Sequence, residues 1–261
     1  MKSHDLHHIN PDRFADSAGV PWAGRSFENN PFAEDDGSAS PELLSAIKEF
    51  HSTGNPNEVF TQITKSRLLI PLLAELGEAG AGAHGQTVDK SADLSIVTVA
   101  TPDNKTAIPV FSSVETMKLW NAKARPVPSD AVRVALAAAS EGTTRIVLDA
   151  GSDSEFAIRR SAIAAIAQQK SWSAPHLDKE VFDEFESAIQ NEEFVVNISI
   201  ESGDPKSKLT GSELNVYLGV KPGLANNDLE VILYRIMERW SASKIIAERV
   251  DSVSLVVKPI S

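Results

Sequence analysis

The segment KTAIPVFSSVETMKLWN, residues 105–121, constrains the fold most strongly, because it encodes a strand, a sharp corner and a helix in immediate succession. Ile108 and Val110 alternate with smaller or polar neighbours, which is typical of a half-buried strand. Pro109 cannot donate a hydrogen bond to a ladder, so we expect this strand to be at a sheet edge or irregular there. Ser112, with a glutamate three residues later, has the spacing of a helix-capping box. The segment predicts a strand–corner–helix unit but specifies no reaction.

Periodic apolar segments lie on both sides of this unit, and their order decides the fold class. We predict helices that begin near residues 41, 56, 129, 162 and 178, and strands at residues 67–76, 94–100, 145–148, 156–158, 194–201 and 214–220. Pro71 interrupts the first of these strands, for which a helix is the alternative. Because the elements do not alternate regularly as βαβα, the predicted fold class is α+β, with a mixed or antiparallel sheet and flanking helices.

Changes in sequence character predict four parts along the chain. They are an extended arm at 1–40, an α+β domain at 41–175, a connecting acidic helix at 176–193 and a smaller domain at 194–261. The last part is expected to have a ββαββ order, because two alternating strands precede an amphipathic helix and the apolar segments 244–250 and 253–257 follow it.

The arm is rich in Pro, Gly, Asn and Asp, yet it carries the large aromatic residues Trp22, Phe27 and Phe32. Burial of aromatic side chains drives association, so we expect these residues to dock the arm onto its own domain. Binding of the arm to a partner and plain disorder are the alternatives.

The net charge of −11 and the lack of a long Lys/Arg cluster argue against nucleic acid as a partner, since phosphate neutralisation provides most of such affinity. The same acidity would be repelled by an anionic membrane surface. The chain has no cysteine, which excludes disulfides and thiol nucleophiles. Residues 1–14 show no apolar signal region and no apolar run approaches the ~20 residues of a membrane span, so the expected location is the cytoplasm.

Two patterns that suggest cofactors lack the necessary context. Residues 80–85, GAGAHG, match G-x-G-x-x-G, but no helix is predicted to open at these glycines, as a dinucleotide pyrophosphate would require. His4, His7 and His8 lie close together, but no further ligands complete a closed metal shell. We therefore expect no cofactor and no metal.

Hydroxyl and carboxylate groups follow two of the predicted strands. Ser112 and Ser113 stand between a strand and a helix, but the glycines of a nucleophile elbow are absent and no histidine can be assigned to them. Asp149 and Asp153 flank Gly151 after another strand, where they fit a turn at least as well as acid–base chemistry. The sequence therefore predicts no preassembled reactive centre.

Several short motifs occur along the chain in an order that resembles a known family. They are PWAGRSF, NPF and DDGS in the arm, IPVFSS before the helix of the corner, VLDAGS after the strand at 145–148, and AERVDSVSL near the end. In this order they resemble the SseB family of bacterial proteins, in a branch with a long N-terminal arm and an added C-terminal unit. The family is named for a serine-sensitivity phenotype, and the resemblance implies no catalytic residues.

These observations predict a cytoplasmic, non-enzymatic protein that binds an unidentified protein or small molecule. The expected binding surface is the corner at Phe111, Ser112 and Ser113 together with Asp149 and Gly151, because the two strand ends that carry them could converge.

The alternative is an enzyme connected with serine metabolism, or a hydrolase. It would use Asp149, Asp153 or Ser113 as its catalytic groups.

Overall fold

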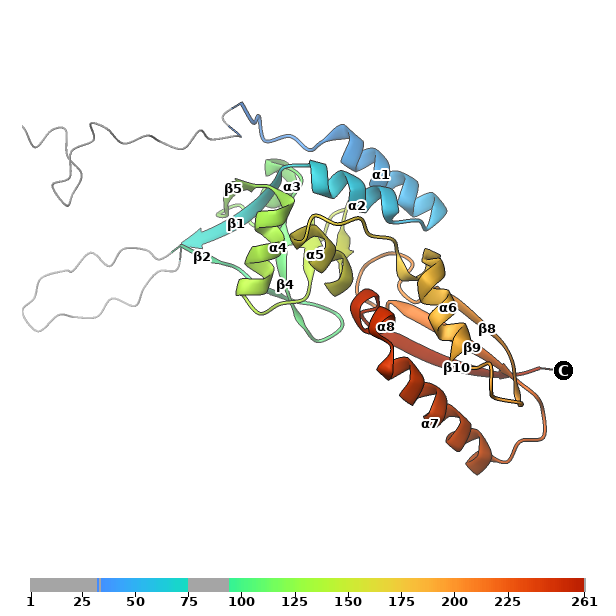
Figure 1. Ribbon diagram of the computed structural model, residues 1–261. Helices are drawn as coiled ribbons and strands as arrows, with labels where there is room; N and C mark the ends of the chain where they lie inside the picture. Colours follow the sequence, from blue (N-terminus) through green and yellow to red (C-terminus); the bar gives the residue numbers. More distant parts are fainter. Residues whose placement is uncertain (1–31, 33, 75–93, 261) are drawn as a thin grey trace, which may run out of the picture. The chain divides into compact units, whose positions relative to one another are not determined.

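The computed structural model describes residues 32, 34–74 and 94–260 (Figure 1). The chain divides into two units, Met1–Asp36 and Gly37–Ser261, and the second contains all the helices and strands described below. In the first unit Phe32 is half-buried and lies in a turn. The Phe32 carbonyl accepts a hydrogen bond of 3.1 Å from the Asp35 amide. Trp22 and Phe27, the histidines at 4, 7 and 8, and the glycines at 80–85 lie outside the described residues, so their predictions stay open.

The first sheet is antiparallel, with the strand order β2-β1-β5. Its members are β1 (Leu68–Ala74), β2 (Leu94–Ile96) and β5 (Arg125–Ser129). The prediction of a strand across Pro71 is thereby confirmed. Pro71 pairs with Pro126 of β5, an edge strand, where missing amide donors are tolerated.

The second sheet is mixed and has the order β3-β4-β6-β7. Its members are β3 (Val99–Ala100), β4 (Thr106–Val110), β6 (Ile146–Leu148) and β7 (Phe156–Ile158). β4 and β6 are parallel, while the other two pairs are antiparallel. Pro109 pairs only with Val147 of β6, because β3 ends its pairing at Ala107. β4 as a whole is an inner strand with a regular register, but at this proline its other side is unpaired by β3, as at a sheet edge.

Two predicted boundaries in this region are wrong. The single strand expected at 94–100 is two short strands that belong to different sheets. The helix α3 (Val114–Trp120) is capped by Ser113 rather than Ser112, since the Ser113 Oγ accepts from the Thr116 amide at 3.1 Å. The Ser112 side chain is instead bound to Asp149.

The remaining helices of this region are largely as predicted. They are α1 (Pro41–Thr53), α2 (Asn57–Lys65), α4 (Ala131–Ser140) and α5 (Arg160–Ala167). Local signals set their ends: the Ser40 Oγ accepts from the Leu43 amide at 3.2 Å, and Gly54 ends α1 with a left-handed φ of 75°. The four helices and both sheets contribute to one large apolar cluster.

The C-terminal sheet has the order β10-β9-β8, and three helices accompany it (Figure 1). The strands are β8 (Val195–Ser202), β9 (Leu214–Val220) and β10 (Val253–Pro259), and the helices are α6 (Lys179–Ser187), α7 (Asn226–Ala242) and α8 (Lys244–Arg249). All six share a second apolar cluster, which has no member in common with the first.

The predicted ββαββ order is wrong at its fourth element. Residues 244–250, expected to be a strand, form α8, whose first turn is capped by a hydrogen bond of 3.3 Å from the Ile246 amide to the Ser243 Oγ. The observed order is β8-β9-α7-α8-β10. β9 and β10 are parallel, and parallel neighbours require a long crossover, which the two helices supply.

Candidate functional site

The two strand ends singled out in the sequence do meet. β4 and β6 are parallel neighbours, so the residues that follow them lie at one edge of the sheet. The Ser112 amide donates to Asp149 Oδ1 at 2.7 Å, and the Ser112 Oγ donates to Asp149 Oδ2 at 2.6 Å. The hydroxyls of Thr116 and Ser154 add hydrogen bonds of 2.9 and 2.7 Å to the same carboxylate.

The hydrogen bonds at this corner are typical of a structural contact between the two strand ends. Asp149 is fully buried, and four donors occupy its two oxygens, which leaves little capacity for a ligand. Its φ of 49° is a left-handed conformation that aspartate tolerates. Phe111 is also fully buried, whereas Gly151 and Asp153 are exposed in the following turn. The binding role expected for this corner stays a prediction.

Asp149→Asn should lower the free energy of unfolding by about 3 kcal/mol, because the amide group turns two new donors toward hydroxyls that already donate. Asparagine keeps the side-chain shape and tolerates the left-handed φ, so the loss would report hydrogen bonding and charge. Urea denaturation measures the change, with the exposed Asp153→Asn as the control. Equal stability of the two variants would show that Asp149 is not an anchor.

A second set of charged groups joins the two apolar clusters. Arg145, directly before β6, is only 1% exposed. Its Nη1 and Nη2 donate to the two oxygens of Asp251 at 2.8 and 2.7 Å, and its Nε donates to Asp103 at 2.9 Å. Asp251 lies between α8 and β10, so this bidentate pair ties the C-terminal sheet to β6.

Arg159, between β7 and α5, makes a second connection between the two apolar clusters. Its Nη2 donates to Asp204 at 2.8 Å and to the carbonyl of Gly211 at 2.7 Å, while its Nη1 contacts Asp251 at 3.3 Å. Asp204 also accepts from the Leu209 amide at 2.7 Å, which closes the loop between β8 and β9. Arg145 and Arg159, which adjoin strands of the mixed sheet, therefore both donate hydrogen bonds to carboxylates from the C-terminal elements.

Glu213, directly before β9, is the exception in this network. It is 8% exposed, and its Oε2 accepts a hydrogen bond of 2.5 Å from the Asp251 amide. Burial raises the pKa of its carboxyl to about 7; the Asp251 amide opposes this shift, the Asp251 carboxylate adds to it, and the charges of Arg159 and Arg145 oppose it. Near neutral pH this side chain is therefore divided between its acid and carboxylate forms.

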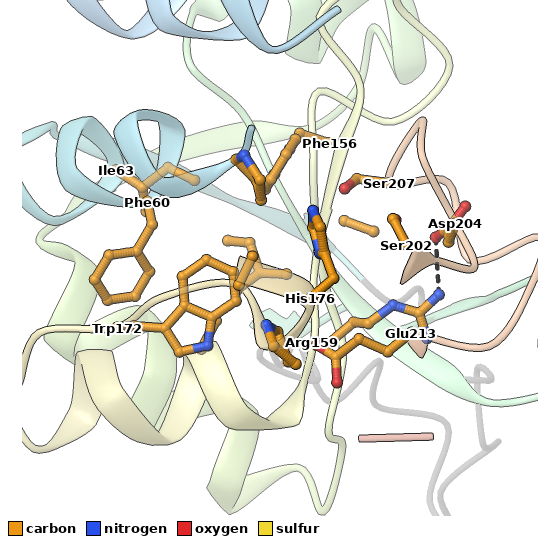
Figure 2. Close-up of a pocket in the computed structure, with 16 residues that line it drawn as sticks. Phe60, Ile63, Phe156, Arg159, Trp172, His176, Ser202, Asp204, Ser207 and Glu213 are labelled. Atoms are coloured by element: carbon orange, nitrogen blue, oxygen red, sulfur yellow. Dashed lines mark hydrogen bonds and ion pairs between the residues drawn. The ribbon is translucent and has the colours of Figure 1, made fainter. Parts of the chain in front are cut away.

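A pocket of about 50 Å³ opens beside this network, and Figure 2 shows its lining. Phe60, Ile63 and Trp172 gather at one end, and Asp204, Glu213 and the Arg159 guanidinium gather at the other. His176 and the hydroxyl residues Ser202 and Ser207 also line it. Burial lowers the pKa of His176, so its ring is neutral at pH 7. The pocket thus has an aromatic end and a polar end.

Comparison with known families relates one segment of the chain to a family model. Residues 42–165 match the family model of the SseB protein N-terminal domain. This segment of the chain is similar to that domain. No match was found among curated proteins or among solved structures.

The matched segment begins in α1 and ends within α5. It therefore supplies Arg145 and Arg159, whereas Asp204, Glu213 and Asp251 lie beyond it. The pocket draws on both the family domain and the C-terminal elements.

The pocket was not predicted from the sequence. Glu213, Ser207 and His176 line one cavity, which no sequence motif indicated. They were missed because β7, the 3-10 helix Pro175–Leu177 and the β8–β9 loop meet only in the fold. The sequence did contain one signal for this site, a charged residue directly beside an apolar strand, as at Arg145 and Glu213. A charge that is buried in such a position must be paired or serve a function.

Within residues 34–74 and 94–260, no group of three or more His, Asp or Glu side chains is arranged to hold a metal ion. No helix of the described segments has the length and apolar character that crossing a membrane demands.

Proposed function

We propose that this chain is a non-enzymatic binding protein of the SseB family and that its partner, a protein or a small molecule, engages the pocket between Trp172 and Glu213. The observation that carries the proposal is the composition of this pocket: mostly apolar and aromatic walls with a few convergent polar groups at one end. This is the usual composition of a ligand site, where the polar groups fix orientation.

The size of the pocket limits what enters it. A cavity of ~150 Å³ accommodates benzene, so about 50 Å³ admits only a few non-hydrogen atoms. We therefore expect the terminal group of a larger ligand, or one side chain of a protein partner, to enter while the remainder lies outside. The net charge of −11 favours neutral or cationic partners over nucleic acids.

The alternative of an enzyme that uses Asp149, Asp153 or Ser113 has weaker support. Asp149 has four donors, Asp153 is exposed, Ser113 caps α3, and none of the three lines the pocket. Glu213 is better suited to proton transfer, because its pKa of about 7 is close to physiological pH. However, no hydrogen bond within the described residues connects it to a nucleophile, as covalent catalysis would require.

Filling the pocket should abolish binding without changing the surface elsewhere. Ser202→Phe places a ring in the pocket from β8, whereas Ser199→Phe places the same ring on an exposed position of the same strand. A fragment library screened by protein-observed NMR should give hits that shift resonances of the pocket residues. These hits should weaken at least tenfold in Ser202→Phe and stay unchanged in Ser199→Phe. Hits that bind both variants equally would place the binding site elsewhere.

A further inference from the structure

The carboxylates around Glu213 outnumber the buried guanidinium groups. Asp103, Asp204 and Asp251 already share Arg145 and Arg159 through hydrogen bonds of 2.7 to 3.3 Å. Arg160 approaches Asp251 only to 4.0 Å and donates instead to the carbonyls of Ala247 and Val250. Among the described residues, no cationic side chain donates to Glu213.

One oxygen of Glu213 is left for the pocket. The Asp251 amide donates to Oε2, and no hydrogen bond from a described residue reaches Oε1. Every fully buried side-chain oxygen among the described residues has a hydrogen-bond partner, so Oε1 must reach accessible space. Glu213 is 8% exposed and is one of the residues that line the pocket, which is the space that we assign to Oε1. The pocket is therefore lined by a buried carboxyl to which no cationic side chain of the described residues donates a hydrogen bond.

We propose that the pocket binds a primary alkylammonium group, with the ammonium on Glu213 Oε1 and the adjoining methylene groups against Trp172 and Phe60. This inference rests on the proposed function, to which it adds the chemical class of the ligand. A small free amine and the end of a lysine side chain from a partner protein share this chemistry.

Charge and size favour an ammonium group over the alternatives. A ligand carboxylate would add another negative charge to a site where the arginines are already occupied. A guanidinium is planar and carries more atoms, whereas an ammonium is compact and fits a cavity of about 50 Å³. The aromatic rings at the far end offer an apolar surface to the carbon atoms of the ligand.

Binding should also be linked to protons. The ammonium pairs with the carboxylate form of Glu213, so below pH 7 each binding event displaces a proton from this group. The other charged groups that surround it from the packed elements are Asp251, Arg145, Arg159 and Asp204. His176, which lines the same cavity, should also weaken ammonium binding at low pH, because its protonated ring would repel a cation.

The experiment is a set of protein-observed NMR titrations of the full chain with ethylamine, ethanol and acetate. A ligand with three non-hydrogen atoms reaches a Kd of about 1 mM at best, so millimolar concentrations are required. Ethylamine should shift resonances of pocket residues, and its Kd should fall about tenfold between pH 6 and pH 8 as Glu213 ionises. Glu213→Gln should weaken ethylamine at least tenfold, while Ser199→Phe should not change it.

A second pair of probes separates the two sources of the ligand. Nα-acetyl-lysine N-methylamide should bind if a protein side chain is the natural ligand, and the same compound acetylated on Nζ should not. Binding of ethylamine without the lysine compound would assign the pocket to a small free amine. Both results support the alkylammonium site.

Two outcomes would overturn the inference, and they differ in what they say about the proposed function. If ethanol or acetate binds as tightly as ethylamine at pH 8, or if ethylamine binds Glu213→Gln equally well, the ligand class is wrong but the pocket still binds ligands. If neither these probes nor the fragment library shifts a pocket residue, both the ligand class and the proposed function fail.

Discussion

Asp251→Asn should lower the free energy of unfolding by about 4 kcal/mol. The carboxylate is 2% exposed and accepts both Nη groups of Arg145, which is itself 1% exposed. It also contacts Arg159 at 3.3 Å. Asparagine keeps only one acceptor oxygen, places an NH2 group against the other guanidinium donor and carries no charge, so a buried guanidinium would lose its counter-charge, which is costly because water cannot replace it.

Urea denaturation at pH 7 measures this loss. Asp183→Asn is the matched control, because Asp183 forms an exposed ion pair with Lys179 within α6 and should contribute no measurable stability. If Asp251→Asn is as stable as the control, the connection between the two apolar clusters does not depend on this network.

Glu213→Gln should become more stable than the natural chain as the pH rises. Folding raises the pKa of this carboxyl from 4.5 to about 7, so its contribution to stability is fully present below pH 4.5 and is lost as the pH rises through 7. The shift corresponds to about 3 kcal/mol at most. Glutamine has no such titration and its amide oxygen can still accept from the Asp251 amide, so it avoids this loss.

The difference in unfolding free energy between Glu213→Gln and the natural chain, measured from pH 5 to pH 8, isolates this contribution from all other titrations. It should change by about 3 kcal/mol in favour of the variant. Glu193→Gln, at an exposed position near β8, controls for the loss of one negative charge. A difference that does not vary with pH would contradict the assigned environment of Glu213.

Local signals predicted much of the fold because they act over a few residues. The start of α1 at Pro41 and its end at Gly54 follow from a serine cap and a glycine that adopts a left-handed φ. The corner between β4 and α3 was also predicted, but its cap was misplaced by one residue. Ser112 and Ser113 are equally good caps in isolation, and only the distant Asp149 decides between them.

The predictions that failed depended on contacts between distant segments. Residues 244–250 have the apolar character of a strand, but the parallel pairing of β9 and β10 leaves them in the crossover, where they form α8. Residues 94–100 are divided because two different sheets each pair with a part of them. Periodicity alone contains no information about either partner.

The same limit applies to the site. Sequence reasoning placed Ser112 and Asp149 together because both follow strands, and the structure confirms that they meet. It did not connect Arg145 with Asp251, which are 106 positions apart, or recognise that Glu213 would be enclosed. Pairing of charges across the fold has no periodic signature.

The central claim is that Glu213 is a buried carboxyl with no cationic hydrogen-bond partner among the described residues, in a pocket that can receive a cation. The most direct test is an NMR titration of its 13C-labelled carboxyl carbon, with Glu213→Gln used to assign the resonance. We expect an apparent pKa of about 7 in the free protein and a lower value in the presence of ethylamine. A pKa near 4.5 that does not respond to ethylamine would show that water or another group already compensates this charge, and would contradict the account.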